Sequence, residues 1–251
     1  MRVYSCEPTL EAMLTCIYEA WTSRLGYKNI KLMVEPLTQQ ELFVEHIHVE
    51  ADGNKAEKLA NACITQISLK FYNDLIYSLM GYEDWRLDNV YHVMLLGFHF
   101  GANVLERVQY RDVMLNNQMR TRIGKEMLKF IDFMRFHEVP GGTLVAHFEP
   151  KSRIIQGLAP HFADRMPSEN WMIVDDVHRE AAIHNDKGEL FYYHLNEEEL
   201  NRLLKTEEFN DEYTELWKIF HRSVAIKHRE NSDLQRNLFP LWTRTHAVEF
   251  Y

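Results

Sequence analysis

The sequence contains few of the features that mark secreted, disulfide-stabilised or membrane-spanning proteins. It has three cysteines among 251 residues, and Cys6, Cys16 and Cys63 show no paired spacing. This arrangement favours neither a disulfide framework nor a zinc site, so we expect a reducing, cytoplasmic location. No charged leader followed by an apolar stretch opens the sequence, and no apolar run approaches the roughly 18 residues that a membrane span needs. We therefore expect neither secretion nor membrane association.

Basic residues are also in deficit, because 28 Lys and Arg stand against 37 Asp and Glu, for a formal net charge of -9. This balance disfavours a protein that coats duplex DNA with its whole surface, since phosphate neutralisation requires clustered Lys and Arg. Local excesses of basic residues occur over 106–135 and 215–246, and acidic residues are concentrated over 197–215. A solvated helical face is the ordinary explanation of each such run.

No internal repeat, low-complexity run or linker divides the sequence, and its 46% hydrophobic content suffices for a full core. We expect a single domain over 1–251, with a helical subregion at 52–134 and a sheet-containing subregion at 135–251. The expected fold class is α+β, in which a helix-rich N-terminal half packs with a mainly antiparallel sheet formed largely by residues 135–195. The C-terminal tail is expected to be helical.

Local signals predict where individual helices and strands begin and end. Asp84 or Asp88 is predicted to cap a helix that Gly97 and Gly101 interrupt, and Ser152 to cap a helix that ends at 166. The run from Asn196 to Glu199 has the sequence of a capping box. Alternating or β-branched segments predict strands at 2–4, 29–34, 41–49, 135–139, 143–148, 171–175, 179–184 and 190–194.

Hydrogen-bonding side chains are densest between Gly157 and Asn185. His161 and Asp164 stand one turn apart on a predicted helix, and Asp175 and His178 lie at the end of the strand that follows. Imidazole and carboxylate groups from two elements can hold a metal ion that activates water. Their spacing matches no standard metal signature, so we assign no metal or cofactor, and whether the chain is an enzyme stays open. The ordinary alternative is a polar network that holds helix to sheet, formed by His161, Asp164, Arg165 and Arg179.

The same stretch also suits a pocket for phosphate or a nucleotide. The side chains that could grip a phosphate are Arg153, His161, Arg165 and Arg179. Trp171 could stack on a base, as aromatic rings do in single-strand and flipped-base binders, and burial in the core is the alternative for this ring. Trp217 and Phe220 have the spacing of a buried helical face. A second basic and aromatic surface is expected in the tail, from Arg222, Lys227, Arg229, Arg236 and Trp242.

Four runs of the chain carry a resemblance to a known family. They are Val3-Tyr4 with the following TLEAMLTCIYEAW, GKEMLKFIDFMRF at 124–136, LAPHFADRMPSENWMIVDDVHREAA from Leu158, and LWKIFHRSVAIKHRENSDLQRNLFPLWTRTHAVEF from Leu216. These runs are similar to successive blocks of an uncharacterised bacterial family, a domain of unknown function that is usually described as DNA metabolism or DNA repair proteins. The similarity extends over nearly the whole chain.

The resemblance implies partners rather than a reaction. Relatives are similar to partners of a radical-SAM protein thought to act in DNA modification or repair, and some are fused to a uracil-DNA-glycosylase-like domain. A radical-SAM cluster needs three cysteines on one short loop, and the cysteines here are scattered. The sequence ends at Tyr251 without a glycosylase domain, so we expect both enzymes to act in trans.

Three hypotheses about function remain open at the level of sequence. The first is an accessory protein in DNA metabolism or repair that binds nucleic acid, the radical-SAM enzyme, or both. The second is a metal-dependent nuclease or nucleotide hydrolase centred on His161, Asp164, Asp175 and His178. The third is a protein-interaction scaffold whose acidic segment, 197–215, meets a basic partner.

Overall fold

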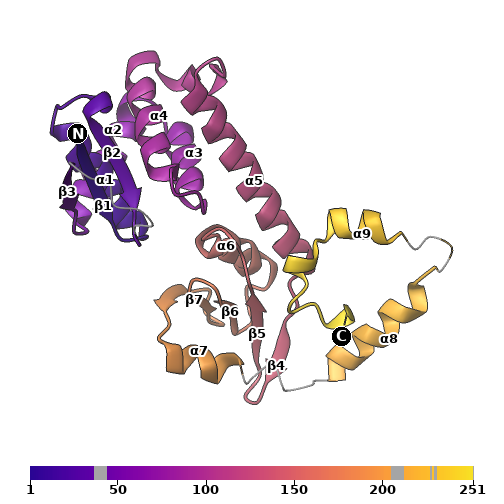
Figure 1. Cartoon of the computed structure of the whole chain (residues 1–251). Coiled ribbons are helices and arrows are strands. Elements are labelled where there is room, and N and C mark those ends of the chain that lie inside the picture. The colour runs from indigo at the N-terminus through magenta and orange to yellow at the C-terminus, as the bar shows by residue number, and fades with distance from the viewer. Residues whose placement is uncertain (37–43, 205–211, 227, 229–230, 251) are drawn as a thin grey trace. The chain divides into compact units, whose positions relative to one another are not determined.

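The computed structural model of the chain describes residues 1–36, 44–204, 212–226, 228 and 231–250. The chain folds into two compact units, Met1–Ile123 and Gly124–Tyr251, and helix α5 (Arg111–Phe133) contributes residues to both (Figure 1). Each unit combines helices with a β-sheet, so the predicted α+β class is confirmed. Across the described ranges, no helix is both long enough and apolar enough to cross a membrane.

The first unit contains a three-stranded sheet with the order β2-β1-β3, in which both neighbours of β1 run parallel to it. The composition of the strands predicts their positions, except that residues 41–43 of the strand predicted at 41–49 lie outside the described residues. It does not predict this pairing, because side chains alternate in the same way in parallel and antiparallel strands. The elements of this unit besides α5 are β1 (Arg2–Cys6), α1 (Leu10–Thr22), β2 (Ile30–Val34), β3 (Glu45–His48), α2 (Gly53–Gln66), α3 (Leu69–Leu79) and α4 (Arg86–Phe100).

Helix α1 covers the sheet of the first unit and carries much of its core. The hydroxyl of Thr9 accepts a hydrogen bond from the backbone N–H of Ala12, which caps the first turn. The helix packs on β1 and β2 with one face and on α2 with another, so it is buried along most of its length. The cysteines of the chain all lie in this core as buried free thiols: Cys6, Cys16 and Cys63.

Helix α4 begins and continues differently from the prediction. Trp85 occupies its N-cap position, and no side chain caps the first turn, so the prediction of an Asp84 or Asp88 cap is wrong. The carboxylate of Asp88 instead accepts a hydrogen bond from the backbone N–H of Leu32 at 2.9 Å, which ties α4 to strand β2. Of the two predicted interruptions, Gly97 lies within the helix, whereas the helix does end before Gly101, which occupies its C-cap position.

The second unit contains a five-stranded sheet whose strands follow chain order, β4-β5-β6-β7-β8. Three of the four pairings are antiparallel, as predicted, but β5 and β6 are parallel and are connected through α6. The elements of this unit are β4 (His137–Val139), β5 (Thr143–Phe148), α6 (Ile155–Arg165), β6 (Trp171–Asp175), β7 (Glu180–His184), β8 (Leu190–His194), α7 (Glu197–Leu204), α8 (Glu212–Val224) and α9 (Ser232–Leu238).

Two helices lie against the sheet of the second unit. Helix α6 packs on β6, β7 and β8. Leu200 and Leu203 of α7 pack on the strand residues Val145, Val174 and Ala181. The predicted capping box of α7 is present, because the carboxylate of Glu199 accepts from the N–H of Asn196 and the Asn196 side chain accepts from the N–H of Glu199.

Helix α6 starts later than predicted. Its N-cap is Ile154, without a side-chain hydrogen bond, so the prediction of a Ser152 cap is wrong. The Ser152 hydroxyl instead donates to Oε2 of Glu126 at 2.8 Å, and Oε1 of Glu126 accepts from the backbone N–H groups of Lys151 and Ser152. Glu126 is only 5% exposed, and its buried carboxylate accepts these hydrogen bonds from the loop between β5 and α6. The carboxylate thereby fixes this loop.

Candidate functional site

A buried polar network lies at the edge of the sheet where the parallel strands β5 and β6 end. Nδ1 of His147, near the end of β5, is 2.9 Å from Oδ1 of Asp176, the residue that follows β6. Nε2 of His246, in the C-terminal segment, is 3.3 Å from Oδ2 of the same carboxylate. The carboxyl ends of adjacent parallel strands meet at one edge, which is why residues 29 positions apart come together. The network joins the C-terminal segment to this edge.

The electrostatics of this network favour an ionised Asp176. Burial opposes ionisation of the carboxyl, but its hydrogen bonds with His147 and His246 outweigh that effect and lower its pKa below the ordinary value. The His147 side chain is fully buried, so a substrate cannot reach its imidazole in this structure. We conclude that the network of His147, Asp176 and His246 holds β5, the residue after β6 and the C-terminal segment together.

Asp175 and His178, predicted as site residues, contact each other in a tight turn. Nδ1 of His178 is 2.7 Å from Oδ2 of Asp175, and Oδ1 accepts from the backbone N–H groups of Val177 and His178. Burial raises the pKa of Asp175, and the hydrogen bonds only partly offset it. The hydrogen bonds of this pair thus stabilise the turn between β6 and β7.

His161 and Asp164 do not join that pair. Both are exposed on α6, a helix that starts beyond the carboxyl end of β5 and returns the chain to the beginning of β6. Among the described residues, no three His, Cys, Asp or Glu side chains form a group that could hold a metal ion.

The residues predicted to grip a phosphate have different surroundings. Arg153 forms an ion pair with Glu180 of β7, while Arg165 is exposed on α6 and Arg179 is exposed in the turn before β7. Within the described part of the chain, no hydrogen bond or ion pair links His161, Asp164, Arg165 and Arg179 into the network considered above. Through its ion pair with Glu180, Arg153 connects the region before α6 to strand β7.

Trp171 is a core residue. Its exposed fraction is 0%, and its ring stacks on His184 with a centroid separation of 4.9 Å and an interplanar angle of 7°. A ring without exposed surface cannot stack on a base, so of the two alternatives for Trp171 the structure favours burial. The hydrophobic residues around it include Phe136, which meets the indole edge to face.

The predicted surface in the C-terminal tail is only partly described. Arg222 on α8 and Arg236 on α9 are exposed, whereas Lys227 and Arg229 lie outside the described residues. Trp217 is half-buried beneath the guanidinium of Arg135, at 5.0 Å from the ring centroid. Phe220 is 55% exposed, so the prediction that it is buried is wrong: the helix docks through Trp217 instead.

The second unit contains a basic and aromatic cluster that the structure assembles from three segments. We call Lys129 of α5, Lys151 of the loop after β5 and Trp242 of the C-terminal segment the Lys–Trp site. The ammonium of Lys151 lies 4.8 Å from the Trp242 ring centroid, and that of Lys129 lies 5.9 Å from it. Both distances are within the range of cation–π attraction. Phe130 supports the indole edge to face at 6.1 Å.

Each segment of the Lys–Trp site is held in place by hydrogen bonds or ion pairs. Glu126, one turn before Lys129, binds the backbone N–H of Lys151 at 2.7 Å and so fixes the loop to α5. The C-terminal segment is held by His246 at Asp176 and by an ion pair of 2.7 Å between Arg135 and Glu249. These contacts hold the C-terminal segment in the position in which Trp242 lies next to the two lysines.

Sequence reasoning identifies the parts of the Lys–Trp site but does not join them. Lys129 lies in the first basic run and Trp242 in the tail surface, while neither composition nor spacing singles out Lys151 or His147. A histidine among apolar residues near the end of a predicted strand is the one available signal for His147. The contacts themselves depend on tertiary structure.

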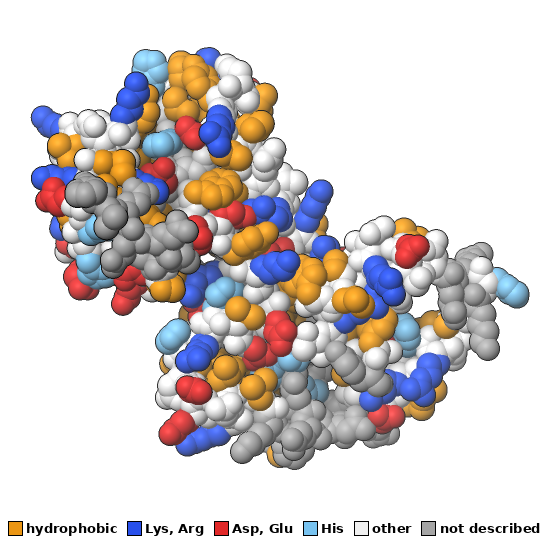
Figure 2. Space-filling model, in the orientation of Figure 1, with side chains coloured by type: hydrophobic (Ala, Val, Ile, Leu, Met, Phe, Trp, Pro, Cys, Tyr) orange, Lys and Arg blue, Asp and Glu red, His pale blue; other side chains and the backbone are white. Residues whose placement is uncertain are grey.

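Basic side chains do not form one continuous face in the view of Figure 2. In that view, which has the orientation of Figure 1, Lys and Arg are interspersed with hydrophobic and acidic side chains on the second unit. This distribution agrees with the net charge of -9.

Comparison with known proteins identifies a family. No curated protein matches the chain. Residues 85–249, from the start of α4 almost to the C-terminus, match the family described as a domain of unknown function, DUF4130. Because this match covers more than half of the sequence, the chain belongs to the DUF4130 family.

Proposed function

We propose that the chain is an accessory, nucleic-acid-binding protein of DNA metabolism or repair, and that it contacts a single strand at the Lys–Trp site. The observation that supports this proposal is one half-buried indole flanked by two ammonium groups from different segments. Aromatic rings stack on bases regardless of sequence, and lysines beside them neutralise the adjoining phosphates. A stacking base would replace the cation–π contacts, and the two ammonium groups would turn to the backbone.

The two lysines of the site have no carboxylate partner among the described residues, whereas most arginines of the neighbouring elements have one. Within the described residues, no carboxylate lies within ion-pair distance of Lys129 or Lys151. The arginines that are paired with carboxylates are Arg120 with Asp74, Arg122 with Glu83, Arg135 with Glu249, and Arg153 with Glu180. Three of the seven basic residues at 106–135 are thus paired with carboxylates, whereas the two lysines keep their charge for an anionic ligand.

The biological setting of the proposal comes from the resemblance of the chain to DNA metabolism and repair proteins. A radical-SAM enzyme acting on DNA is the proposed partner, and a uracil-DNA-glycosylase-like protein would act in trans. A tagged chain produced in its native host would then copurify with that radical-SAM enzyme. Its absence from the eluate, with both proteins expressed, would remove the partner from the proposal.

Binding of a fluorescent oligothymidylate, followed by anisotropy at several salt concentrations, tests the nucleic-acid half of the proposal. We expect salt-sensitive binding of the wild type. In the double variant Lys129→Gln/Lys151→Gln, the log–log slope should become shallower by about 0.7 for each phosphate that is no longer neutralised. Trp242→Leu should weaken binding by about 1–3 kcal/mol with little change in slope, because it removes stacking and leaves both charges.

Lys187→Gln is the matched control, because it removes the same charge from an exposed turn of the same unit. It should leave the affinity almost unchanged. The proposal fails if the wild-type protein shows no salt-sensitive binding, or if Lys187→Gln weakens binding as much as a change at Lys129.

A further inference from the structure

The last strand of the second sheet, β8, is an edge strand with an unusual surface. Among the described residues it pairs only with β7. Its central residues are aromatic and solvent-exposed: Phe191 at 43%, Tyr192 at 42% and Tyr193 at 54%. Edge strands are ordinarily protected by charged residues, proline or a covering element, because their free N–H and C=O groups attract other strands. This edge has three aromatic residues where such protection is expected.

The hydrogen bonds at both ends of the β7–β8 pair show which backbone groups are free. The N–H of Leu195 donates to the carbonyl of Arg179 at 2.7 Å, and the N–H of Asn185 donates to the carbonyl of Glu189 at 3.1 Å. Hydrogen-bonded and non-hydrogen-bonded pairs alternate along an antiparallel ladder. The N–H and C=O groups of Tyr192, and of its neighbours two positions away on either side, therefore point away from β7.

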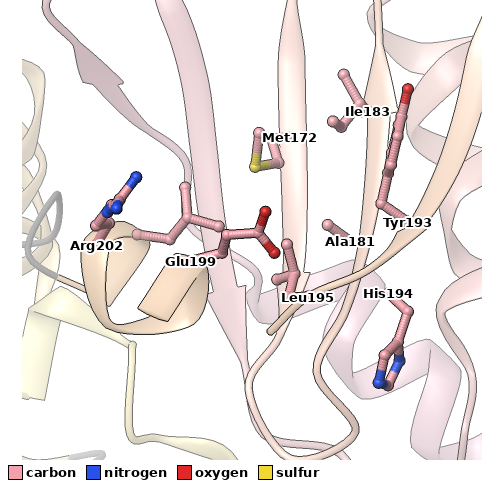
Figure 3. Close-up of a pocket in the computed structure, with 9 residues that line it drawn as sticks. Met172, Ala181, Ile183, Tyr193, His194, Leu195, Glu199 and Arg202 are labelled. Carbon is pink, nitrogen blue, oxygen red and sulfur yellow. The ribbon is translucent and has the colours of Figure 1, made fainter. Parts of the chain in front are cut away.

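A pocket of about 330 Å³ lies beside this edge, between the sheet and α7 (Figure 3). Met172, Ala181 and Ile183 form its wall on the sheet, and Tyr193 of β8 stands at its side. Because side chains alternate along a strand, Phe191 lies on the same face as Tyr193, whereas Tyr192 lies on the other. A strand added to β8 would thus direct every second side chain towards the pocket.

The charges around the pocket indicate which charged side chains such a strand would have. Residues 189–204 contain four glutamates, while Arg202 is their single Lys or Arg. Arg202 is 3.8 Å from Glu198, so even this charge is partly compensated. The exposed first turn of α7, Glu197 to Glu199, therefore favours a cationic partner and disfavours nucleic acid.

We propose that β8 accepts an extended segment of a partner protein as a sixth strand, with an aliphatic side chain in the pocket and Lys or Arg at the flanking positions. Pairing with the outward backbone groups supplies register, the pocket selects the apolar residue, and the glutamates select the basic ones. This surface shares no residue with the Lys–Trp site, so it stands independently of the proposed function.

The test uses the full-length protein and a fluorescent peptide with blocked ends, followed by anisotropy. The peptide has a central leucine with a lysine two positions before it and another two positions after it, so that all three side chains face the side of α7. We expect saturable binding that falls about tenfold when alternate peptide nitrogens are methylated, since methylation removes backbone pairing and keeps the charge. Replacing the lysines by glutamates should abolish binding. Tyr193→Ser should weaken it several-fold, whereas Trp242→Leu should not change it.

Two variants at position 192 separate the contribution of the outward backbone N–H from that of the aromatic ring. Tyr192→Pro removes an outward N–H without breaking the β7–β8 ladder, and Tyr192→Ala removes the same ring while keeping the N–H. We expect Tyr192→Pro to bind the peptide about tenfold more weakly than Tyr192→Ala, with equal thermal unfolding midpoints for the two variants. Equal affinities for these two variants, or binding that survives methylation, would overturn the proposal. So would a wild-type dimer that dissociates in Tyr192→Pro, because the occupant of the edge would then be a second copy.

Discussion

At the scale of single residues, the neighbours Asp175 and Asp176 have opposite ionisation behaviour. Asp175 is fully buried in a turn, and desolvation raises its pKa. Asp176 is also largely buried, but its contacts with His147 and His246 lower its pKa. Two adjacent carboxylates in the sequence therefore contribute differently to stability. The difference arises from partners 29 and 70 residues away, which sequence spacing does not reveal.

The lowered pKa of Asp176 predicts a specific pH dependence of folding. The carboxyl binds a proton less readily when folded than when unfolded, so its stabilisation is fully present above the ordinary pKa of about 4. This stabilisation is lost as the pH falls through the folded pKa. Asp176→Asn should lower the free energy of unfolding by about 2 kcal/mol near neutral pH, with the difference shrinking in strong acid.

Urea unfolding of both proteins across the acidic range measures this difference. Asp186→Asn, in an exposed turn, is the control and should differ from the wild type by no more than about 0.5 kcal/mol. A penalty for Asp176→Asn that stays constant down to the lowest pH would contradict an electrostatic origin.

At the scale of elements, a glycine determines how closely α3 approaches α4. A Cβ atom added at Gly97 would lie 2.5 Å from Cζ of Phe71 and 3.0 Å from Cδ1 of Ile67. Phe71 is buried in the core, so its ring cannot simply turn away. Gly97 therefore stays within the helix because packing outweighs its poor helix propensity.

Gly97→Ala and Gly124→Ala form a matched pair of substitutions in helices. Gly97→Ala should destabilise the protein by about 1–3 kcal/mol, because overpacking against Phe71 exceeds the gain in propensity. Gly124, in α5, has no atom within 4 Å of an added Cβ, so Gly124→Ala should stabilise by about 0.5–1 kcal/mol. Chemical denaturation checks both signs, and a stabilising Gly97→Ala would refute the packing argument.

At the scale of the whole molecule, the two units have cores of their own. The core of the first unit contains residues of β1, β2 and the helices α1 to α4. A core of the second unit lies between its sheet and α7. The boundary at 123 and 124 falls inside the continuous helix α5, where no change in composition marks it. This is why the sequence predicts a single domain, with subregions that meet at 134 and 135 instead.

Separate cores predict separate responses to a mutation. Gly97→Ala should raise hydrogen–deuterium exchange in α3 and α4, because local opening there costs less free energy once their contact is strained. The amides of β5, β6 and β7 should exchange at wild-type rates. Mass spectrometry of peptic peptides compares the two regions within one sample, and an equal rise in both would show that the units open together.

Much of the secondary structure could be predicted from the sequence, for a local reason. The hairpin of β4 and β5, the strands β6 to β8 and the capping box of α7 follow from alternation, turn residues and caps, which involve near neighbours. The caps assigned to Asp88 and Ser152 are wrong because both side chains bind distant partners, Leu32 and Glu126. Local propensity cannot anticipate such contacts.

The sequence by itself determined the α+β class, the positions of most elements and the excess of acidic over basic residues, because composition and periodicity express these properties directly. Only the tertiary structure decided that Trp171 is core, that β5 and β6 are parallel, and that Lys129, Lys151 and Trp242 meet. These three results depend on which distant segments pack together. Packing is set by the joint burial of many side chains, a property of the folded chain that no local window of sequence contains.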